Sequence, residues 1–274
     1  MTDLSEGRWE ELAQAYAFIG NSLLKPMTQT DKVGLDPEFW QAFPDFGDAK
    51  VRAALRNLAC FAKSALAEAE NVAATKRTGS SANSDMDSRE AFNATGAIDS
   101  GAVGADTASS VLDEAALRVA VEYTHLFVGP PSPAAPPWET MNRCKEATVG
   151  FGEATFQMRA LLREAGFALS NENRQYEDHL GIELLYLSEL CRLRAKDGEG
   201  AGGAEGSEKA ESAESAACAG GAESAKDVRS FIDEHPLSWV SALHEKVREA
   251  APGGYFDKLL ALTDAVLAWH RAHL

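Results

Sequence analysis

The chain has 274 residues, of which 45% are hydrophobic and 25% are charged, a composition typical of a globular protein. This composition excludes a wholly disordered or fibrous chain, and no apolar run approaches the roughly 18 residues that a membrane span needs. The N-terminal sequence MTDLSEGRWEEL is acidic and amphipathic, unlike a secretory signal peptide, so we expect a cytoplasmic protein.

The charge balance points to a basic partner. Forty-two acidic residues against 26 basic ones give a net charge of −16. A field of that sign repels phosphate backbones and anionic lipids, so we expect no nucleic-acid partner and no stable membrane insertion. It attracts cations, which makes a basic peptide a natural ligand.

Apolar residues recur at helical spacing over most of the chain, and no comparable stretch alternates with period two. Near the N-terminus such faces lie within residues 9–23 and 51–66, and near the C-terminus within residues 256–267. Further helices are predicted over residues 112–127, 140–165, 175–195 and 237–250. The pattern predicts an all-α fold in a single compact helical domain spanning residues 1–274.

Two segments depart from this pattern and are predicted to be flexible insertions. Residues 76–110 contain few side chains that could anchor a core, so burial could not offset the entropy lost on ordering them. Residues 197–226 are an acidic, low-complexity run of Gly, Ala, Ser and Glu.

The densest cluster of unusual residues is EYTHLFVGPPSPAAPPWET, from Glu122 to Thr140. A helix is predicted to end at Phe127, and five prolines in eight residues then force an extended crossing until Thr140 can cap the next helix. Such a connector is either a rigid linker with Trp138 tucked into the core or the lining of a groove.

Two more clusters lie at predicted helix boundaries. Glu177 and Asp178, followed by His179, begin the most apolar helix, where acids either cap the helix N-terminus or recognise a ligand. The run from Phe231 to Trp239 breaks one helix at Pro236 and starts another, as an ordinary helix corner would.

A metal centre or an enzyme receives little support. Glu122-x-x-His125 has the spacing of di-iron helices, and His179 with Glu183 could face one ion, but a di-iron site needs that motif twice. The four cysteines contain no C-x-x-C pair. Nucleophile-elbow, phosphate-loop and dinucleotide motifs are absent too, so we assign no catalytic residue, no metal ligand and no cofactor.

Taken together, the clusters resemble the TorD/DmsD/NarJ family of cytoplasmic maturation chaperones for molybdenum oxidoreductases. The family pattern joins a helix ending Leu-Phe-x-Gly-Pro, a Pro-Pro-aromatic-(Glu/Gly)-(Ser/Thr) step, a Glu-Pro-x-Asp-His-x-Gly helix start and a Phe-x-x-x-His-x-x-x-Trp corner. The chain departs from this pattern at Gln175-Tyr176, where the family usually has Glu-Pro, so one acid is lost there. In this chain the four motifs appear in order as Leu126-Phe127-Val128-Gly129-Pro130, Pro136-Pro137-Trp138-Glu139-Thr140, Asp178-His179-Leu180-Gly181 and Phe231 to His235 to Trp239.

The resemblance implies a chaperone that binds the twin-arginine signal peptide and the apo form of a DMSO-, TMAO- or nitrate-reductase-type enzyme before export. It implies no enzymatic activity and a monomer or weak homodimer. Carried over by motif position, the peptide-binding residues are Tyr123, Leu126, Phe127, Trp138, Glu177, Asp178 and His179, with Glu122, His235 and Trp239 as secondary candidates. We expect Asp178 and His179 at the rim of a peptide groove.

Elementary chemistry agrees with that implication. A twin-arginine peptide carries paired guanidinium groups and then an apolar stretch, so its receptor needs carboxylates beside an aromatic-lined groove. Two alternatives stay open: an accessory subunit stably bound to an oxidoreductase complex and a helical metalloenzyme. The first would bury a permanent apolar face, and the second would retain a metal.

Overall fold

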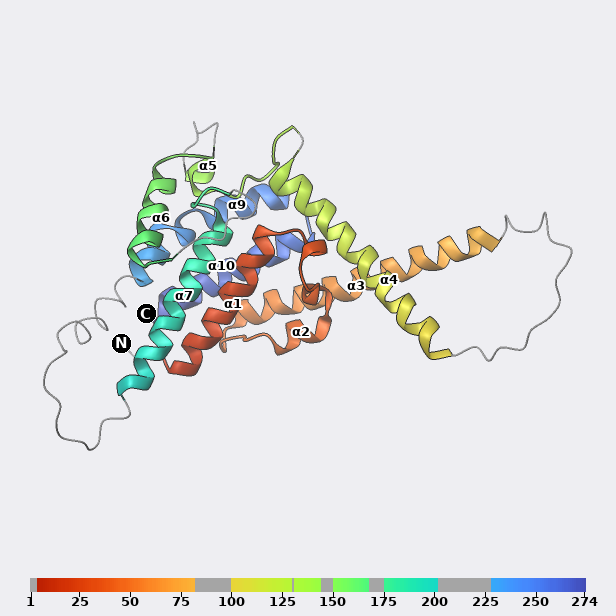
Figure 1. The fold of residues 1–274 in the computed structure, drawn as a ribbon, viewed down its shortest axis with the longest axis horizontal. Coiled ribbons are helices and arrows are strands. Elements are labelled where there is room, and N and C mark those ends of the chain that lie inside the picture. Colours follow the sequence, from red (N-terminus) through yellow and green to blue (C-terminus); the bar gives the residue numbers. More distant parts are fainter. Residues whose placement is uncertain (1–3, 82–99, 130, 144–149, 168–174, 202–227) are drawn as a thin grey trace, which may run out of the picture.

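The computed structural model describes residues 4–81, 100–129, 131–143, 150–167, 175–201 and 228–274. Within these ranges the fold is all-α, as the sequence predicts, and no β-strand is present (Figure 1). Of the predicted insertions, residues 76–110 and 197–226, the parts 82–99 and 202–226 lie outside the described ranges, and the described parts are helical. At their edges, helix α3 continues to Ser81, α4 begins at Ser100 and α7 ends at Ala201.

Helices α1 (Glu6–Leu24) and α7 (Leu180–Ala201) pack side by side in the centre of the bundle (Figure 1). Two glycines allow their backbones to touch. A Cβ added to Gly20 would lie 2.8 Å from the carbonyl oxygen of Gly181, and one added to Gly181 would lie 2.7 Å from that of Gly20. Any side chain at either position would therefore push the two helices apart.

Helices α3 (Ala49–Ser81) and α4 (Ser100–Tyr123) contact each other and extend beyond the rest of the bundle (Figure 1). Helix α10 (Tyr255–His273) packs against α3, α9 and α4. The short helix α2 (Pro37–Ala42), which the hydrophobic pattern did not predict, starts from the side chain of Asp36, which accepts a hydrogen bond from the backbone N–H of Glu38.

Glu122, one of the secondary candidates, holds the start of α10. Its carboxylate accepts hydrogen bonds from the backbone N–H groups of Tyr255 (3.1 Å) and Phe256 (2.9 Å). Burial raises the pKa of Glu122, although these hydrogen bonds oppose the shift. The side chain thus satisfies two of the N–H groups that every helix N-terminus leaves unpaired.

The proline-rich connector folds back onto the end of α4. A π-helical turn, η3 (Thr124–Val128), closes that helix, and Gly129 follows it with a φ of +78° that favours glycine. The N–H groups of Ala134 and Ala135 then donate to the carbonyl oxygens of His125 and Leu126. The connector is therefore fixed against the helix end at two points.

The single helix predicted over residues 140–165 is wrong. The structure has two helices there, α5 (Glu139–Arg143) and α6 (Glu153–Glu164), and α6 begins after Gly152, whose backbone is extended. Packing explains why glycine is needed before α6, because a Cβ on Gly150 would lie 2.9 Å from the Trp138 ring and one on Gly152 2.6 Å from Thr140.

The other predicted helices are present with shifted bounds. Helix α7 starts at Leu180, not at residue 175, because His179 still belongs to a turn in which its N–H donates to the carbonyl oxygen of Tyr176. Residues 228–234 are helical, and α9 (Pro236–Ala250) follows after His235, at the predicted corner. Among the described residues, no helix is both long enough and apolar enough to span a lipid bilayer.

Candidate functional site

The Pro-Pro-aromatic step and the Asp-His motif, far apart in sequence, lie antiparallel to one another. The N–H of Glu139 donates to the carbonyl oxygen of Asp178 (2.9 Å), and the N–H of Leu180 donates to that of Pro137 (3.0 Å). This short backbone bridge, between Trp138 and His179, brings α5 to the start of α7.

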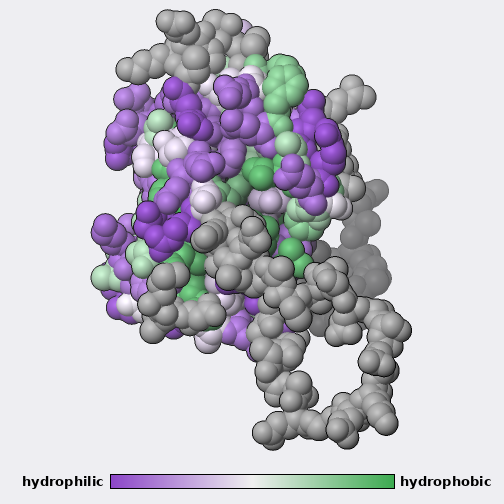
Figure 2. All heavy atoms as spheres, turned by 90° about the vertical axis from the view of Figure 1, so that its left-hand side faces the viewer, coloured by the Kyte–Doolittle hydropathy of each residue, from purple (hydrophilic) through white to green (hydrophobic). Residues whose placement is uncertain are grey.

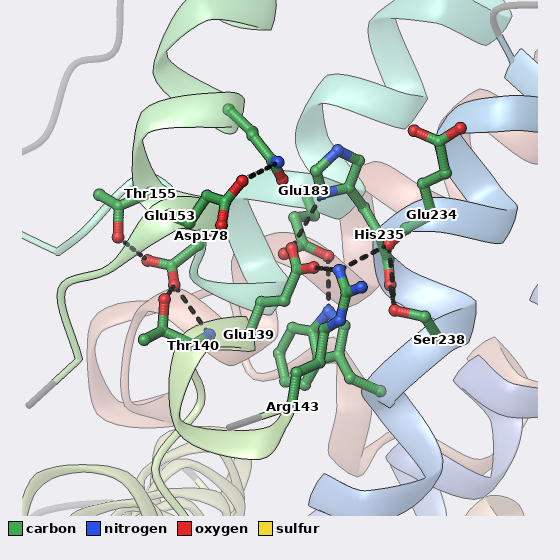
Figure 3. A network of polar contacts seen from close by, with 12 residues as sticks. Glu139, Thr140, Arg143, Glu153, Thr155, Asp178, Glu183, Glu234, His235 and Ser238 are labelled. Carbon is green, nitrogen blue, oxygen red and sulfur yellow. Dashed lines mark hydrogen bonds and ion pairs between the residues drawn. The ribbon is translucent and has the colours of Figure 1, made fainter. Parts of the chain in front are cut away.

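Asp178 is fully buried and holds three helices together (Figure 3). One carboxylate oxygen accepts from the backbone N–H (3.0 Å) and the hydroxyl (2.7 Å) of Thr140 in α5. The other accepts from the hydroxyl of Thr155 in α6 (3.0 Å). Burial raises the pKa of Asp178, and these hydrogen bonds limit the rise. The acid therefore caps α5, a neighbouring helix, while its own residue precedes α7.

His179 is also fully buried and electrically neutral. Its Nδ1 accepts from the N–H of Gly181 (3.0 Å), so the ring proton sits on Nε2, which has no hydrogen-bond partner among the described residues. Burial lowers the pKa of His179 to about 3. The expectation that Asp178 and His179 lie at the rim of a groove is wrong for both side chains, because the backbone bridge draws them inward.

A second buried group centres on Glu139, whose partners are Arg143 on the same helix and His235 from another motif (Figure 3). His235 Nδ1 lies 2.8 Å from one carboxylate oxygen of Glu139, and Arg143 pairs with the other. Burial on its own would raise the pKa of Glu139, but the hydrogen bonds from His235 and Arg143 lower it overall. Glu139 is therefore a buried anion with two partners.

Glu183, on α7, lies beside this anion and differs from it in being protonated. One oxygen accepts from the indole N–H of Trp239 (3.1 Å), while the other has no donor among the described residues. Burial, followed by the charge of Glu139, raises the pKa of Glu183 well above its ordinary value. A proton on Glu183 supplies the missing hydrogen bond, donated to Glu139, so we treat Glu183 as neutral.

Glu139, Glu183 and His235 also form the one group among the described residues that could hold a metal, with ligand atoms within 4.8 Å of one another. These are not the pairs considered from sequence spacing. The guanidinium of Arg143 contacts Glu139 directly, and a cation bound beside it would be repelled. The hydrogen bonds account for the cluster, and we assign it no metal.

Three residues that the resemblance associates with the peptide lie in the hydrophobic core. Tyr123, Leu126 and Phe127 are buried, and the ring of Phe127 packs edge-on against Phe256 of α10 at 5.0 Å. In this conformation they join α4 to α10. Their direct contact with a peptide stays a prediction.

Trp138 instead belongs to a group of accessible rings. It is partly buried, its ring centroid lies 6.0 Å from that of Tyr176, and Tyr176 lies 5.6 Å from Phe151, which lies 5.0 Å from Phe156. Tyr176 is 39% exposed, Phe151 40% and Phe156 55%. We call these four residues the aromatic surface. On the end of the molecule that carries α6, hydrophobic residues lie among hydrophilic ones (Figure 2).

Glu177 stands at the edge of the aromatic surface. Its two oxygens accept from Nε (2.8 Å) and the terminal nitrogen (3.0 Å) of Arg159, which lies on α6. These hydrogen bonds lower the pKa of Glu177, although partial burial opposes the shift. Of the seven predicted peptide-binding residues, Trp138 and Glu177 are thus the two that are not buried.

Sequence reasoning missed Phe151, Phe156 and Tyr176 as members of the site. Phe151 and Phe156 were absorbed into one long predicted helix, and Tyr176 stands where the family pattern usually has proline. The run Gly150-Phe151-Gly152 was a usable signal, since two glycines so close together disfavour a continuous helix. An aromatic residue between them then falls in a loop and not on the apolar face of a helix.

Comparison with known proteins places the sequence in a family. A family model described as the nitrate reductase delta subunit matches residues 97–245, more than half of the chain. The chain belongs to this family. No individual curated protein gives a match. The family is part of the TorD/DmsD/NarJ group of redox-enzyme maturation chaperones, which confirms the resemblance and supports a molybdoenzyme apoprotein as the partner.

Proposed function

We propose that the chain binds the twin-arginine signal peptide of a nitrate-reductase-type molybdoenzyme in the cytoplasm. Binding would retain the apoprotein until its cofactor is installed. Family membership supports the maturation role, and the aromatic surface with its edge carboxylates supports peptide recognition. The proposal needs no catalytic residue and no cofactor in the chaperone.

The observation that carries the proposal is the pairing of exposed rings with acidic groups. Phe151, Phe156 and Tyr176 offer apolar faces for the hydrophobic part of a leader peptide. Glu177 and the exposed Glu153, beside Phe156, offer carboxylates for its guanidinium groups. The net charge of −16 draws a cationic peptide toward the chain.

The buried motif residues have a supporting part in this proposal. Asp178 fixes the first turns of α5 and α6. Trp138 directly precedes α5, and Phe156 lies near the start of α6. His179 pairs with Trp138 across the backbone bridge and packs edge-on against its ring at 6.3 Å. Both act on the aromatic surface from beneath it.

A stable accessory subunit is the second candidate function. Leu117, Val121 and Val128 expose more than half of their surface along one side of α4 and η3. A permanent complex would cover such an apolar stripe. Release of the chaperone from the mature enzyme distinguishes the first function from the second.

Calorimetry with two synthetic leader peptides tests peptide recognition. The first carries Ser-Arg-Arg-Ala-Phe followed by alternating Leu and Ala, and the second replaces both arginines with alanine. We expect the first to bind about ten- to a hundredfold more tightly, because each charge-assisted hydrogen bond contributes about 1.5–3 kcal/mol. The difference should shrink as salt rises, because part of it is Coulombic. Equal affinities at low salt would refute arginine recognition.

A further inference from the structure

The ion pair between Arg159 and Glu177 already has the chemistry of a complex between a peptide arginine and its receptor. The guanidinium engages both carboxylate oxygens, at 2.8 and 3.0 Å, and lies 5.8 Å from the ring centroid of Phe156. A two-point carboxylate contact combined with an aromatic face is the environment that best holds an arginine from another chain.

We propose that Arg159 is an intramolecular competitor for the signal-peptide arginine, occupying Glu177 until a peptide guanidinium takes its place. This inference rests on the proposed function and adds a specificity-determining residue to it. A peptide without arginine cannot exchange with Arg159, and it would meet an aromatic surface whose carboxylate is still neutralised.

The exposure of the pair makes the exchange inexpensive. The side chain of Arg159 is 41% exposed, so its guanidinium can turn into water, and the carboxylate of Glu177, which is 19% exposed, is paired again by the incoming guanidinium. An ion pair with a solvent-exposed partner contributes little, so displacing Arg159 costs little. The incoming guanidinium regains the same two hydrogen bonds, and the apolar residues that follow it gain contacts with Phe151 and Tyr176.

The chain supplies a matched control on the same helix. Arg163 lies one turn beyond Arg159 on α6, is exposed, and has no recorded side-chain ion pair among the described residues. Replacing either arginine with glutamine removes one positive charge from the same helix. A difference between Arg159→Gln and Arg163→Gln therefore reports the ion pair with Glu177 and not the net charge.

We expect Arg159→Gln to bind the Ser-Arg-Arg-Ala-Phe peptide about three- to fivefold more tightly than the parent, the fold-change equivalent to an exposed ion pair. Arg163→Gln should change the affinity by less than about twofold. In a Glu177→Gln background, Arg159→Gln should give no gain, because the carboxylate that the two arginines share is missing. Affinity for the Ala-Ala peptide should not respond to Arg159→Gln.

The possible results distinguish a failure of the Arg159 competitor role from a failure of the proposed peptide recognition. A parent that prefers the arginine peptide but shows equal gains in Arg159→Gln and Arg163→Gln would overturn the competitor role alone. A loss of affinity in Arg159→Gln would also overturn it, since Arg159 would then be a peptide contact. A parent and an Arg159→Gln variant that both bind the two peptides equally would overturn arginine recognition as well.

Discussion

Replacing Glu139 with glutamine should lower the melting temperature by roughly 6–12 °C, whereas the same change at Glu183 should lower it by roughly 3 °C or less. The carboxylate of Glu139 accepts from His235 and Arg143 and, by our assignment, from protonated Glu183. Glutamine leaves one acceptor oxygen for these donors and points an N–H₂ group at the rest. Losing two hydrogen bonds to a buried anion costs about 3 kcal/mol or more.

The small expected effect at Glu183 follows from its charge state. A protonated Glu183 donates to Glu139 and accepts from Trp239, and a glutamine amide can do both. Thermal melts of Glu139→Gln and Glu183→Gln at pH 6 check the contrast. Equal losses in the two variants would contradict the assignment of one anion and one neutral acid.

The change of folding stability with pH tests the protonated state of Glu183 independently. The pKa of Glu183 is raised in the folded protein, mainly by burial, so the unfolded chain releases this proton first as the pH rises above about 4.5. Its contribution to stability is complete below that pH and is lost toward the folded-state pKa. The parent therefore loses this contribution as the pH rises, so the free energy of unfolding of Glu183→Gln, taken relative to that of the parent, should increase from pH 5 to pH 8.

Replacing Asp178 with alanine should cost about 3 kcal/mol of folding free energy, which is the second large effect we expect. The change leaves the N–H and hydroxyl of Thr140 and the hydroxyl of Thr155 without their acceptor. Asn caps helices about as well as Asp, so Asp178→Asn should cost only about 1–2 kcal/mol. Urea unfolding of the two variants and of Thr155→Val, which removes one of the three bonds, measures the series.

Peptide binding by Asp178→Asn distinguishes support from contact. Because the carboxylate is buried and used internally, we expect the affinity for the arginine peptide to change less than about threefold, well short of the charge-assisted bond that a contacting acid would supply. A loss of about tenfold or more, in a variant that melts close to the parent, would show instead that Asp178 meets the peptide arginine directly.

The periodicity of the sequence predicted the helices because most of them have one strongly apolar face. Trp9, Tyr16 and Leu23 repeat on α1, and Leu259 and Val266 on α10, and all are buried as such faces require. The corner at Pro236 was equally readable, since proline begins a helix more easily than it continues one. Both features depend only on residues close together in sequence, so they can be recognised without knowledge of the fold.

The site was less predictable because its geometry depends on contacts distant in sequence. Nothing near Asp178 shows that Thr140 and Thr155 will meet its carboxylate, 38 and 23 residues away along the chain. The local pattern indicated only that acids at a helix start can cap it, and the rim position was an implication of the family resemblance. The partnership of Glu139 with Glu183 likewise joins two motifs that sequence reasoning treated as independent.

The measurement that tests the central claim most directly is where a bound peptide lies. A twin-arginine leader with benzoylphenylalanine in place of its Phe, irradiated on the full chain, should attach to the aromatic surface at Trp138, Phe151, Phe156 or Tyr176. Mass spectrometry of the digested adduct locates the attachment, and excess unlabelled arginine peptide should suppress it. Attachment concentrated on the stripe of Leu117, Val121 and Val128 would contradict the proposed site.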